Sequence, residues 1–225
     1  MKIKSYMAEF MGAFALVLVG STAAVLNNEL SSIALAFGLI LMAMIYAVGK
    51  VSGGHFNPAV SFAMLLTKRM NVKDFGMYVL FQLLGSLIAV LCLVPFVGDL
   101  SNLGANEIFV DFGGQTTLLI LLLGVLVEAV GTFLFVFVIL RVTKNPDLKN
   151  LAGLIIGLTL TTLIYFAGPL TNAGFNPIRS IFPALFQGGT ALEQLWIFIV
   201  GPMIGAFLAA VAEPFFDETE TLQAE

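Results

Sequence analysis

Apolar and polar residues follow one another along the chain in blocks, and six of the apolar blocks are long. They lie near residues 5–26, 32–49, 74–97, 117–141, 149–167 and 193–215. An α-helix needs about 20 apolar residues to cross the hydrocarbon core of a bilayer. Strands in membranes are shorter and alternate in polarity, so the pattern predicts six transmembrane helices and an all-α membrane protein.

Two further apolar segments, near residues 57–67 and 176–187, are too short to cross a bilayer. Both begin with Asn-Pro, directly after a stretch that contains glycine. Open backbone ends survive at membrane depth only when other protein covers them. We therefore expect two re-entrant half-helices that enter the bundle from opposite sides.

Composition supports a membrane location. The 225 residues are 59% hydrophobic and 11% charged, and the mean hydropathy is +1.02. A soluble domain carries about 25% charged residues, so most of this surface must face lipid or another helix. The sequence offers no nucleophile constellation, metal cluster or cofactor motif. We therefore expect no enzyme activity, no cofactor, no metal and no nucleic-acid partner.

The basic residues predict the orientation. With six spans, nine of the ten Lys and Arg residues fall on one side: Lys2, Lys4, Lys50, Lys68, Arg69, Lys73, Arg141, Lys144 and Lys149. The positive-inside rule makes that side cytoplasmic, so we expect a multi-pass protein of the cell (plasma) membrane with both termini in the cytoplasm. Arg179 is the exception and needs a reason. The acidic segment 216–225 predicts a flexible tail.

The two halves of the chain match at a constant offset, which is 128 − 9 = 119 residues for the pair Glu9 and Glu128. Shared Gly, Tyr, Asn and Pro residues keep the same offset. The repeats cover about 1–110 and 117–215, and each holds three spans, so the second copy is inserted upside down. Inverted repeats place a site near the midplane, where discontinuous helices meet. We expect one channel domain over 1–225.

The two Asn-Pro segments carry the candidate site. The stretches Gly53–Val60 (GGHFNPAV) and Asn172–Ser180 (NAGFNPIRS) resemble the paired Asn-Pro-Ala boxes of the aquaporin family, and the resemblance covers essentially the whole chain. Two boxes, six spans and an inverted repeat are a specific combination, whereas one box would carry little weight. The resemblance implies a right-handed, aquaporin-like bundle and a homotetramer with a pore in each subunit.

The box residues also have a physical interpretation that is independent of the family. They are Asn57, Pro58, Ala59, Asn176, Pro177 and Ile178. Asparagine is a good N-cap and proline suits the first helical position, so each box starts a helix. Two helix N-termini that meet at mid-membrane create a positive potential. The two asparagine amides can donate to a water, which turns its hydrogens away from them; neutral water passes, whereas cations and protons do not.

The stretches before the boxes predict a polar pore lining. By resemblance, backbone carbonyls of these residues face the lumen: Gly53, Gly54, His55, Phe56, Asn172, Gly174 and Phe175. His55, the one histidine, is either structural or a titrating gate. Glu9 and Glu128 are intramembrane carboxylates. We expect them to support the two loops by accepting hydrogen bonds from loop amides; a proton relay is the alternative.

A selectivity filter follows from the resemblance. Its implied members are Phe37, Ile164, Ala173 and Arg179. Arg179 would donate hydrogen bonds to the permeant and repel cations. Water-selective members have His at the position of Ile164. Glycerol facilitators have Asp at the position of Ser180, directly after the Arg. The set is most similar to the wider, more apolar filters of archaeal aquaporins. A one-residue gap in the alignment would place Tyr165 in the filter instead of Ile164.

Ile178 departs from the family pattern, which has Ala here, as this chain does at Ala59. We expect the two boxes to pack where the half-helices touch, and overpacking a tight contact costs about 1–3 kcal/mol. Either the neighbours of Ile178 are small, or the two box asparagines are displaced.

The function predicted from these features is passive permeation of water without protons or ions. Permeation of glycerol or another small neutral solute is the nearest alternative. An ion-coupled transporter could share the inverted repeat, but it would need an ionisable group that faces the lumen. A structural junction protein would need a blocked lumen.

Overall fold

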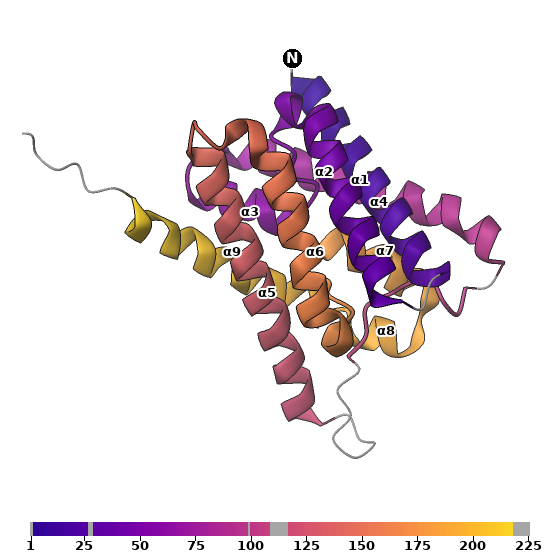
Figure 1. Cartoon of the computed structure of the whole chain (residues 1–225). Coiled ribbons are helices and arrows are strands. Elements are labelled where there is room, and N and C mark those ends of the chain that lie inside the picture. The colour runs from indigo at the N-terminus through magenta and orange to yellow at the C-terminus, as the bar shows by residue number, and fades with distance from the viewer. Residues whose placement is uncertain (1, 27–28, 99, 109–116, 218–225) are drawn as a thin grey trace, which may run out of the picture.

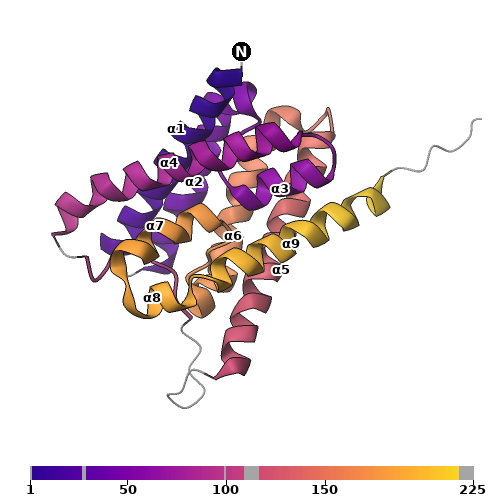
Figure 2. The same cartoon turned by 180° about the vertical axis from the view of Figure 1, so that it is seen from behind.

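The computed structural model describes residues 2–26, 29–98, 100–108 and 117–217, and these residues contain helices and no strand. The long helices are α1 (Lys2–Leu26), α2 (Leu30–Ser52), α4 (Val72–Val97), α5 (Leu118–Lys144), α6 (Ala152–Thr171) and α9 (Ile197–Ala212). The short ones are α3 (Pro58–Leu66), α7 (Pro177–Gln187), α8 (Gly189–Gln194), and the 3-10 turns η1 (Lys149–Leu151) and η2 (Glu213–Phe216). Figures 1 and 2 show α3 and α7 lying between the long helices.

Six helical segments in the described part of the chain are long and apolar enough to cross a membrane. The fifth ends at Thr171 rather than near residue 167, because Pro169 lies inside α6 without ending it; neighbouring helices can satisfy the backbone group that such a proline leaves free. The last begins earlier than expected, at Gly189, and consists of α8, α9 and η2. The protein is therefore an all-α, multi-pass membrane protein.

The helices pack in pairs that the inverted repeat relates. Helix α1 packs along α4, α5 packs along α9, and α2 packs along α6. Glycine allows the first two crossings: a Cβ on Gly85 of α4 would lie 3.0 Å from the Phe14 backbone nitrogen, and one on Gly205 of α9 would lie 2.8 Å from that of Phe133. Close approach through glycine is typical of helices in membranes.

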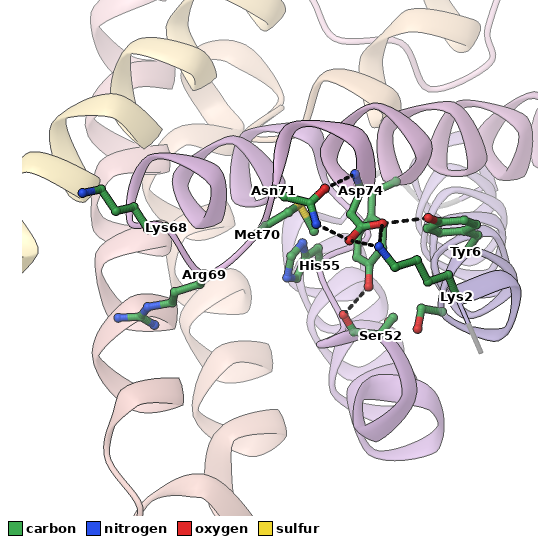
Figure 3. A pocket seen from close by; sticks show the side chains of 11 residues that line it. Lys2, Tyr6, Ser52, His55, Lys68, Arg69, Met70, Asn71 and Asp74 are labelled. Atoms are coloured by element: carbon green, nitrogen blue, oxygen red, sulfur yellow. Dashed lines mark hydrogen bonds and ion pairs between the residues drawn. The ribbon is translucent and has the colours of Figure 1, made fainter.

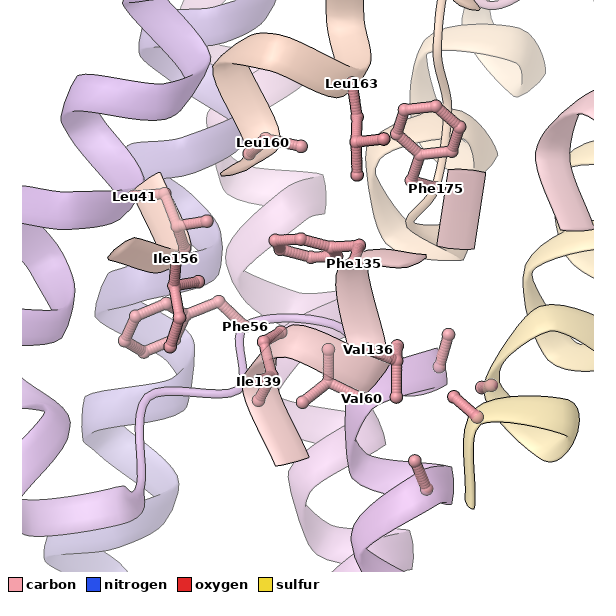
Figure 4. Packing of buried hydrophobic residues seen from close by; sticks show 14 of the residues in the cluster. Leu41, Phe56, Val60, Phe135, Val136, Ile139, Ile156, Leu160, Leu163 and Phe175 are labelled. Carbon is pink, nitrogen blue, oxygen red and sulfur yellow. The ribbon is translucent and has the colours of Figure 1, made fainter. Parts of the chain in front are cut away.

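Two other glycines of the long helices, Gly12 and Gly131, receive aromatic rings. A side chain on Gly12 of α1 would overlap the Phe56 ring, and one on Gly131 of α5 would overlap the Phe175 ring. These glycines therefore receive a residue of each re-entrant loop instead of a second helix. Figure 4 shows both rings within the main buried apolar cluster, with Phe135 between them.

Basic residues form ion pairs with acidic residues at one end of the bundle. Lys2 pairs with Asp74 at 3.0 Å, and Arg69 pairs with Glu213 at 3.1 Å. Lys144 also contacts Glu213, at 3.2 Å. Because α1, the α3–α4 connection, α5 and η2 all contribute, basic residues from distant parts of the sequence lie at the same end, as the sequence predicts.

The first two residues of the expected tail, Phe216 and Asp217, are held by the rest of the chain. Phe216 ends η2, and Asp217 accepts hydrogen bonds from Arg141 at 2.8 Å and from Lys144 at 2.6 Å. The hydrogen bond from Lys144, with that from Arg141, holds the pKa of Asp217 below its ordinary value. The remaining tail residues, 218–225, lie outside the described residues.

Candidate functional site

Each Asn-Pro box starts a half-helix. Asn57 has an extended backbone, and its side-chain oxygen accepts a hydrogen bond from Ala59 N at 2.8 Å. Asn176 caps α7 in the same way through Ile178 N, at 3.2 Å. A proline occupies the first turn of each helix, where its missing N–H leaves nothing unsatisfied. The caps fix the orientation of both asparagine amides.

The two asparagines also hold each other's loop. Asn57 Nδ2 donates to the Phe175 carbonyl at 2.8 Å, and Asn176 Nδ2 donates to the Phe56 carbonyl at 2.9 Å. A side-chain amide has two N–H donors, so one donor of each asparagine is left. Both asparagines line one narrow cavity of about 20 Å³, which has room for about one water. Two asparagines, each with a spare donor, therefore line a space with room for about one water.

The loops before the boxes share an unusual backbone. Three repeat-related pairs of residues have left-handed φ angles: Gly53 (99°) and Asn172 (59°), Gly54 (70°) and Ala173 (49°), and Phe56 (50°) and Phe175 (52°). Such angles strain residues other than glycine, by about 1–3 kcal/mol each, and occur mostly at functional sites. The inverted repeat thus reproduces the path of the backbone even where the residue types differ.

Two buried carboxylates accept hydrogen bonds from the backbone amides of these loops. Glu9 accepts from His55 N at 3.1 Å and from Phe56 N at 2.7 Å. Glu128 accepts from Gly174 N at 2.9 Å and from Phe175 N at 2.7 Å. Both glutamates are fully buried, and neither is among the residues that line the narrow cavity. Their position matches loop support better than a proton relay.

The four residues of the expected filter share the narrow cavity. Phe37, Ile164, Ala173 and Arg179 all line it. The guanidinium of Arg179 lies 5.0 Å from the centre of the Phe37 ring, and its Nη1 donates to the Gly104 carbonyl at 2.6 Å. No ion pair between described residues involves Arg179, so its guanidinium lines the cavity without direct contact with a carboxylate.

The competing alignment of the filter puts Tyr165 on the wrong face of α6. Ile164 is 3% exposed and lines the cavity, whereas Tyr165 is 45% exposed on the outside of the chain. The geometry supports the ungapped alignment.

Not every expected pore carbonyl lies in the narrow cavity. His55, Gly174 and Phe175 line it, whereas Gly53, Gly54, Phe56 and Asn172 do not. The Phe56 side chain is fully buried, and the Asn172 carbonyl accepts from the Asn106 side chain at 3.1 Å. The carbonyls of Phe56 and Phe175 already hold the box asparagines, although each carbonyl can accept a second hydrogen bond.

Ile178 is fully buried, in a cluster of apolar residues that includes Ala13 and Val17 of α1 and Ala89 of α4. The same cluster holds the larger Leu103, so Ile178 packs among both small and large side chains.

Residues 1–212 match the profile of the major intrinsic protein family. The chain belongs to this family. A curated relative, "Glycerol uptake facilitator protein-like 6" of Lactiplantibacillus plantarum, is 43% identical over 212 residues, which cover 92% of this chain and 95% of the relative. "Aquaporin Z" of Brucella melitensis is 36% identical, over 91% of this chain and 93% of the relative.

Solved structures support the fold of this major intrinsic protein. The aquaglyceroporin from Plasmodium falciparum superimposes with a TM-score of 0.75, at 17% sequence identity, over 94% of this chain and 95% of that chain. At that identity the likeness concerns the fold alone. Proteins of this family are membrane channels, and the six spans and two half-helices agree with that.

Two polar side chains and one backbone carbonyl that sequence reasoning missed complete the site of this major intrinsic protein. Gln82 of α4 donates to Glu9 Oε2 at 2.7 Å. Asn106 bridges the Asn172 carbonyl and the Ser180 hydroxyl, and Gly104 supplies the carbonyl that holds Arg179. Gln82 could have been found, since it is a polar residue within an apolar run. Asn106 and Gly104 lie in a connection without regular pattern.

A wide polar vestibule leads to one side of the site (Figure 3). Lys2 and Tyr6 reach Asp74 across it, and Asn71 bonds the same carboxylate at 2.7 Å. His55 lines both the vestibule and the narrow cavity. The single histidine of this major intrinsic protein therefore marks the point where the vestibule narrows.

Proposed function

We propose that this protein is a passive membrane channel for water that also admits small neutral solutes such as glycerol and excludes protons and ions. The observation that carries the proposal is the pair Asn57 and Asn176, each a helix N-cap and each with one amide hydrogen left for the lumen. The names of the relatives, which include both aquaporins and a glycerol facilitator-like protein, agree with water and glycerol as permeants.

Proton exclusion follows from the same pair. A water that accepts a hydrogen bond from each asparagine must turn its own hydrogens toward the two ends of the pore. The chain of hydrogen bonds that a proton would follow is then broken at this water. The N-termini of α3 and α7 add positive potential at the same place, so a cation also meets a barrier.

The filter sets which neutral molecules pass. Arg179 supplies donors and charge, Phe37 restricts the width, and Ile164 and Ala173 add apolar surface. Water loses one polar partner at Ile164 relative to a filter with histidine, at a cost of about 1 kcal/mol. A solute with an apolar edge loses less, which favours a modest flux of glycerol. The set remains most similar to the filters of archaeal aquaporins.

The channel is a homotetramer of the cell membrane with both termini in the cytoplasm. The family resemblance supports the tetramer, in which each subunit has its own pore. The basic residues gathered at one end, with Lys2, Arg69 and Lys144 in ion pairs there, support a cytoplasmic position for that end.

An ion-coupled transporter is the alternative from another class. It would need an ionisable group in the lumen, and the buried carboxylates Glu9 and Glu128 are engaged by loop amides. An imposed ion gradient separates the two: a coupled carrier would accumulate solute, whereas a channel would only equilibrate it.

Light scattering from reconstituted vesicles tests the proposal. After an osmotic step of sucrose, the vesicles should shrink faster than empty controls. After a step of glycerol, they should shrink and then re-swell slowly. With an internal pH dye and an imposed potential, the proton flux should equal that of empty vesicles. Water flux equal to the control, or a proton flux above it, would contradict the proposed function.

A further inference from the structure

His55 lies where the vestibule meets the narrow cavity, and its two ring nitrogens have different surroundings. Nδ1 lies 3.0 Å from the Ser61 hydroxyl oxygen. For Nε2, the described residues provide no hydrogen-bond partner. Since the ring lines both spaces, its Nε2 edge is the polar group that it offers to a permeating molecule. Whether that nitrogen carries a hydrogen depends on what Ser61 does at Nδ1.

The Gln82 side chain determines what Ser61 can do. Gln82 Nε2 donates to Glu9 Oε2 at 2.7 Å and to Ser61 Oγ at 3.0 Å. The reverse orientation of the amide would place its oxygen 2.7 Å from a carboxylate oxygen that already accepts from Phe56 N. Two acceptors at that distance repel, so the amide nitrogen must face Glu9 and Ser61. Ser61 therefore receives a hydrogen bond from Gln82.

The Ser61 hydroxyl still has its own hydrogen to donate. Within the described residues, its oxygen contacts Gln82 Nε2 and His55 Nδ1. Gln82 Nε2 is a donor, so Nδ1 is the one of these two contacts that can accept the hydroxyl hydrogen. A hydrogen bond from the hydroxyl to Nδ1 requires a lone pair on Nδ1. A neutral imidazole with Nδ1 bare has its hydrogen on Nε2. We infer that Ser61 and Gln82 are positioning residues that hold His55 as the Nε2–H tautomer, so that the channel meets a donor at this point.

This donor has a consequence for permeation, which rests on the proposed function. The other tautomer would offer a lone pair and would turn a passing water the opposite way. With Nε2–H, the water turns its oxygen toward His55, in the same sense as toward the spare donors of Asn57 and Asn176. The orientation of the water is then set at the cytoplasmic entrance of the narrow cavity, before the water reaches the two asparagines.

The second repeat provides a matched control. Ser180 is the repeat partner of Ser61 (180 − 61 = 119), but its hydroxyl donates to Asn106 Oδ1 at 2.7 Å. The partner of Gln82 is Gly201 (201 − 82 = 119). The relay of amide, hydroxyl and imidazole is thus present in one repeat only, and Ser180→Ala removes a comparable hydroxyl without touching it.

Solid-state NMR of the full chain in bilayers tests the tautomer directly. Because the chain has one histidine, labelling with [15N]histidine gives signals from His55 alone, and a nitrogen with a hydrogen resonates far from one without. At about pH 8, where an ordinary imidazole is neutral, we expect Nδ1 bare and Nε2 protonated. Ser180→Ala and Ser61→Thr, which retain the relevant hydroxyl, should give the same spectrum.

Ser61→Ala and Gln82→Met should each populate the tautomer with the hydrogen on Nδ1. Ser61→Ala removes the hydroxyl that donates to Nδ1. Gln82→Met removes the amide that donates to Ser61, so the Ser61 oxygen can instead accept a hydrogen bond from Nδ1–H. A wild-type spectrum with Nδ1 protonated would overturn the inference without any variant. So would an unchanged spectrum in folded Ser61→Ala.

Water flux in the same vesicles tests the consequence separately. Ser61→Ala should lower water permeability by up to about five-fold, the factor that corresponds to one net hydrogen bond of about 1 kcal/mol, and Ser61→Thr should restore it. A tautomer change with unaltered flux would overturn the role of His55 in orienting water. Wild-type vesicles that pass no water would instead contradict the proposed function and leave the tautomer result standing.

Discussion

Gly201 of α9 provides a sharp test of how the second re-entrant loop is supported. A Cβ at this position would lie 2.6 Å from the Glu128 Cβ and 3.0 Å from the Val125 carbonyl oxygen. Ordinary van der Waals contact begins at 3.4 Å, so the shortfall at Glu128 is 3.4 − 2.6 = 0.8 Å. The obstacles are a Cβ and a backbone atom, which cannot rotate away. Gly201→Ala must therefore move α9 or the base of Glu128.

The cost can be isolated by a matched variant. Gly76 lies in α4, and a Cβ there would meet nothing within 4 Å. Both substitutions to alanine gain up to about 1 kcal/mol of helix propensity, so this gain cancels in the comparison. Overpacking costs about 1–3 kcal/mol. The melting temperature of Gly201→Ala should then be about 2–12 °C below that of Gly76→Ala.

Water permeation should fall together with stability in Gly201→Ala. The Glu128 carboxylate holds the amides of Gly174 and Phe175, and the Phe175 carbonyl holds Asn57. Displacement of the glutamate is therefore transmitted to a box asparagine. Water flux per folded molecule should fall in Gly201→Ala and remain at the wild-type level in Gly76→Ala. Equal melting temperatures and equal fluxes for the two variants would refute this account of the loop.

Three further outcomes are expected. Arg179→Val should keep the fold and let protons or small cations leak in a vesicle flux assay, because charge and donors are both lost; an unchanged leak would make Arg179 structural. Ile164→His should reduce glycerol flux more than water flux, and a constant ratio would remove Ile164 from the filter. Because the pKa of Asp217 is lowered by Lys144 and Arg141, its contact should be complete above the ordinary carboxyl pKa and lost as the pH falls through the lowered value; a spin label near the C-terminus that gains no mobility on acidification would contradict it.

Much of the fold could be predicted because the membrane restricts the choices. Apolar length alone located the six spans, and Asn-Pro at the start of two short segments located α3 and α7. Helix ends were less certain, since Pro169 does not end α6. Periodicity says little about ends when both flanks of a helix are apolar.

The supporting contacts of the site were harder to predict than its central residues. The box asparagines follow from N-cap chemistry, whereas their reciprocal bonds to Phe56 and Phe175 depend on two segments over 100 residues apart in sequence meeting head to head. The carbonyl that holds Arg179 belongs to Gly104, in a connection without a pattern. The role of Gly12 and Gly131 also depends on the fold, because sequence cannot tell a glycine that admits a helix from one that admits a ring.

The contact between α2 and α6 has a consequence for how such a chain can change over time. A Cβ on Gly38 would lie 2.6 Å from the Gly157 carbonyl oxygen, and a Cβ on Gly157 would lie 2.6 Å from the Gly38 carbonyl oxygen. These glycines are repeat partners (157 − 38 = 119), so each position meets its own duplicate. In two identical copies of a single repeat, one altered codon would introduce both clashes at once. Fusion of the copies places Gly38 and Gly157 under separate codons. Neither residue can gain a side chain, however, while the backbone of the other stays in place.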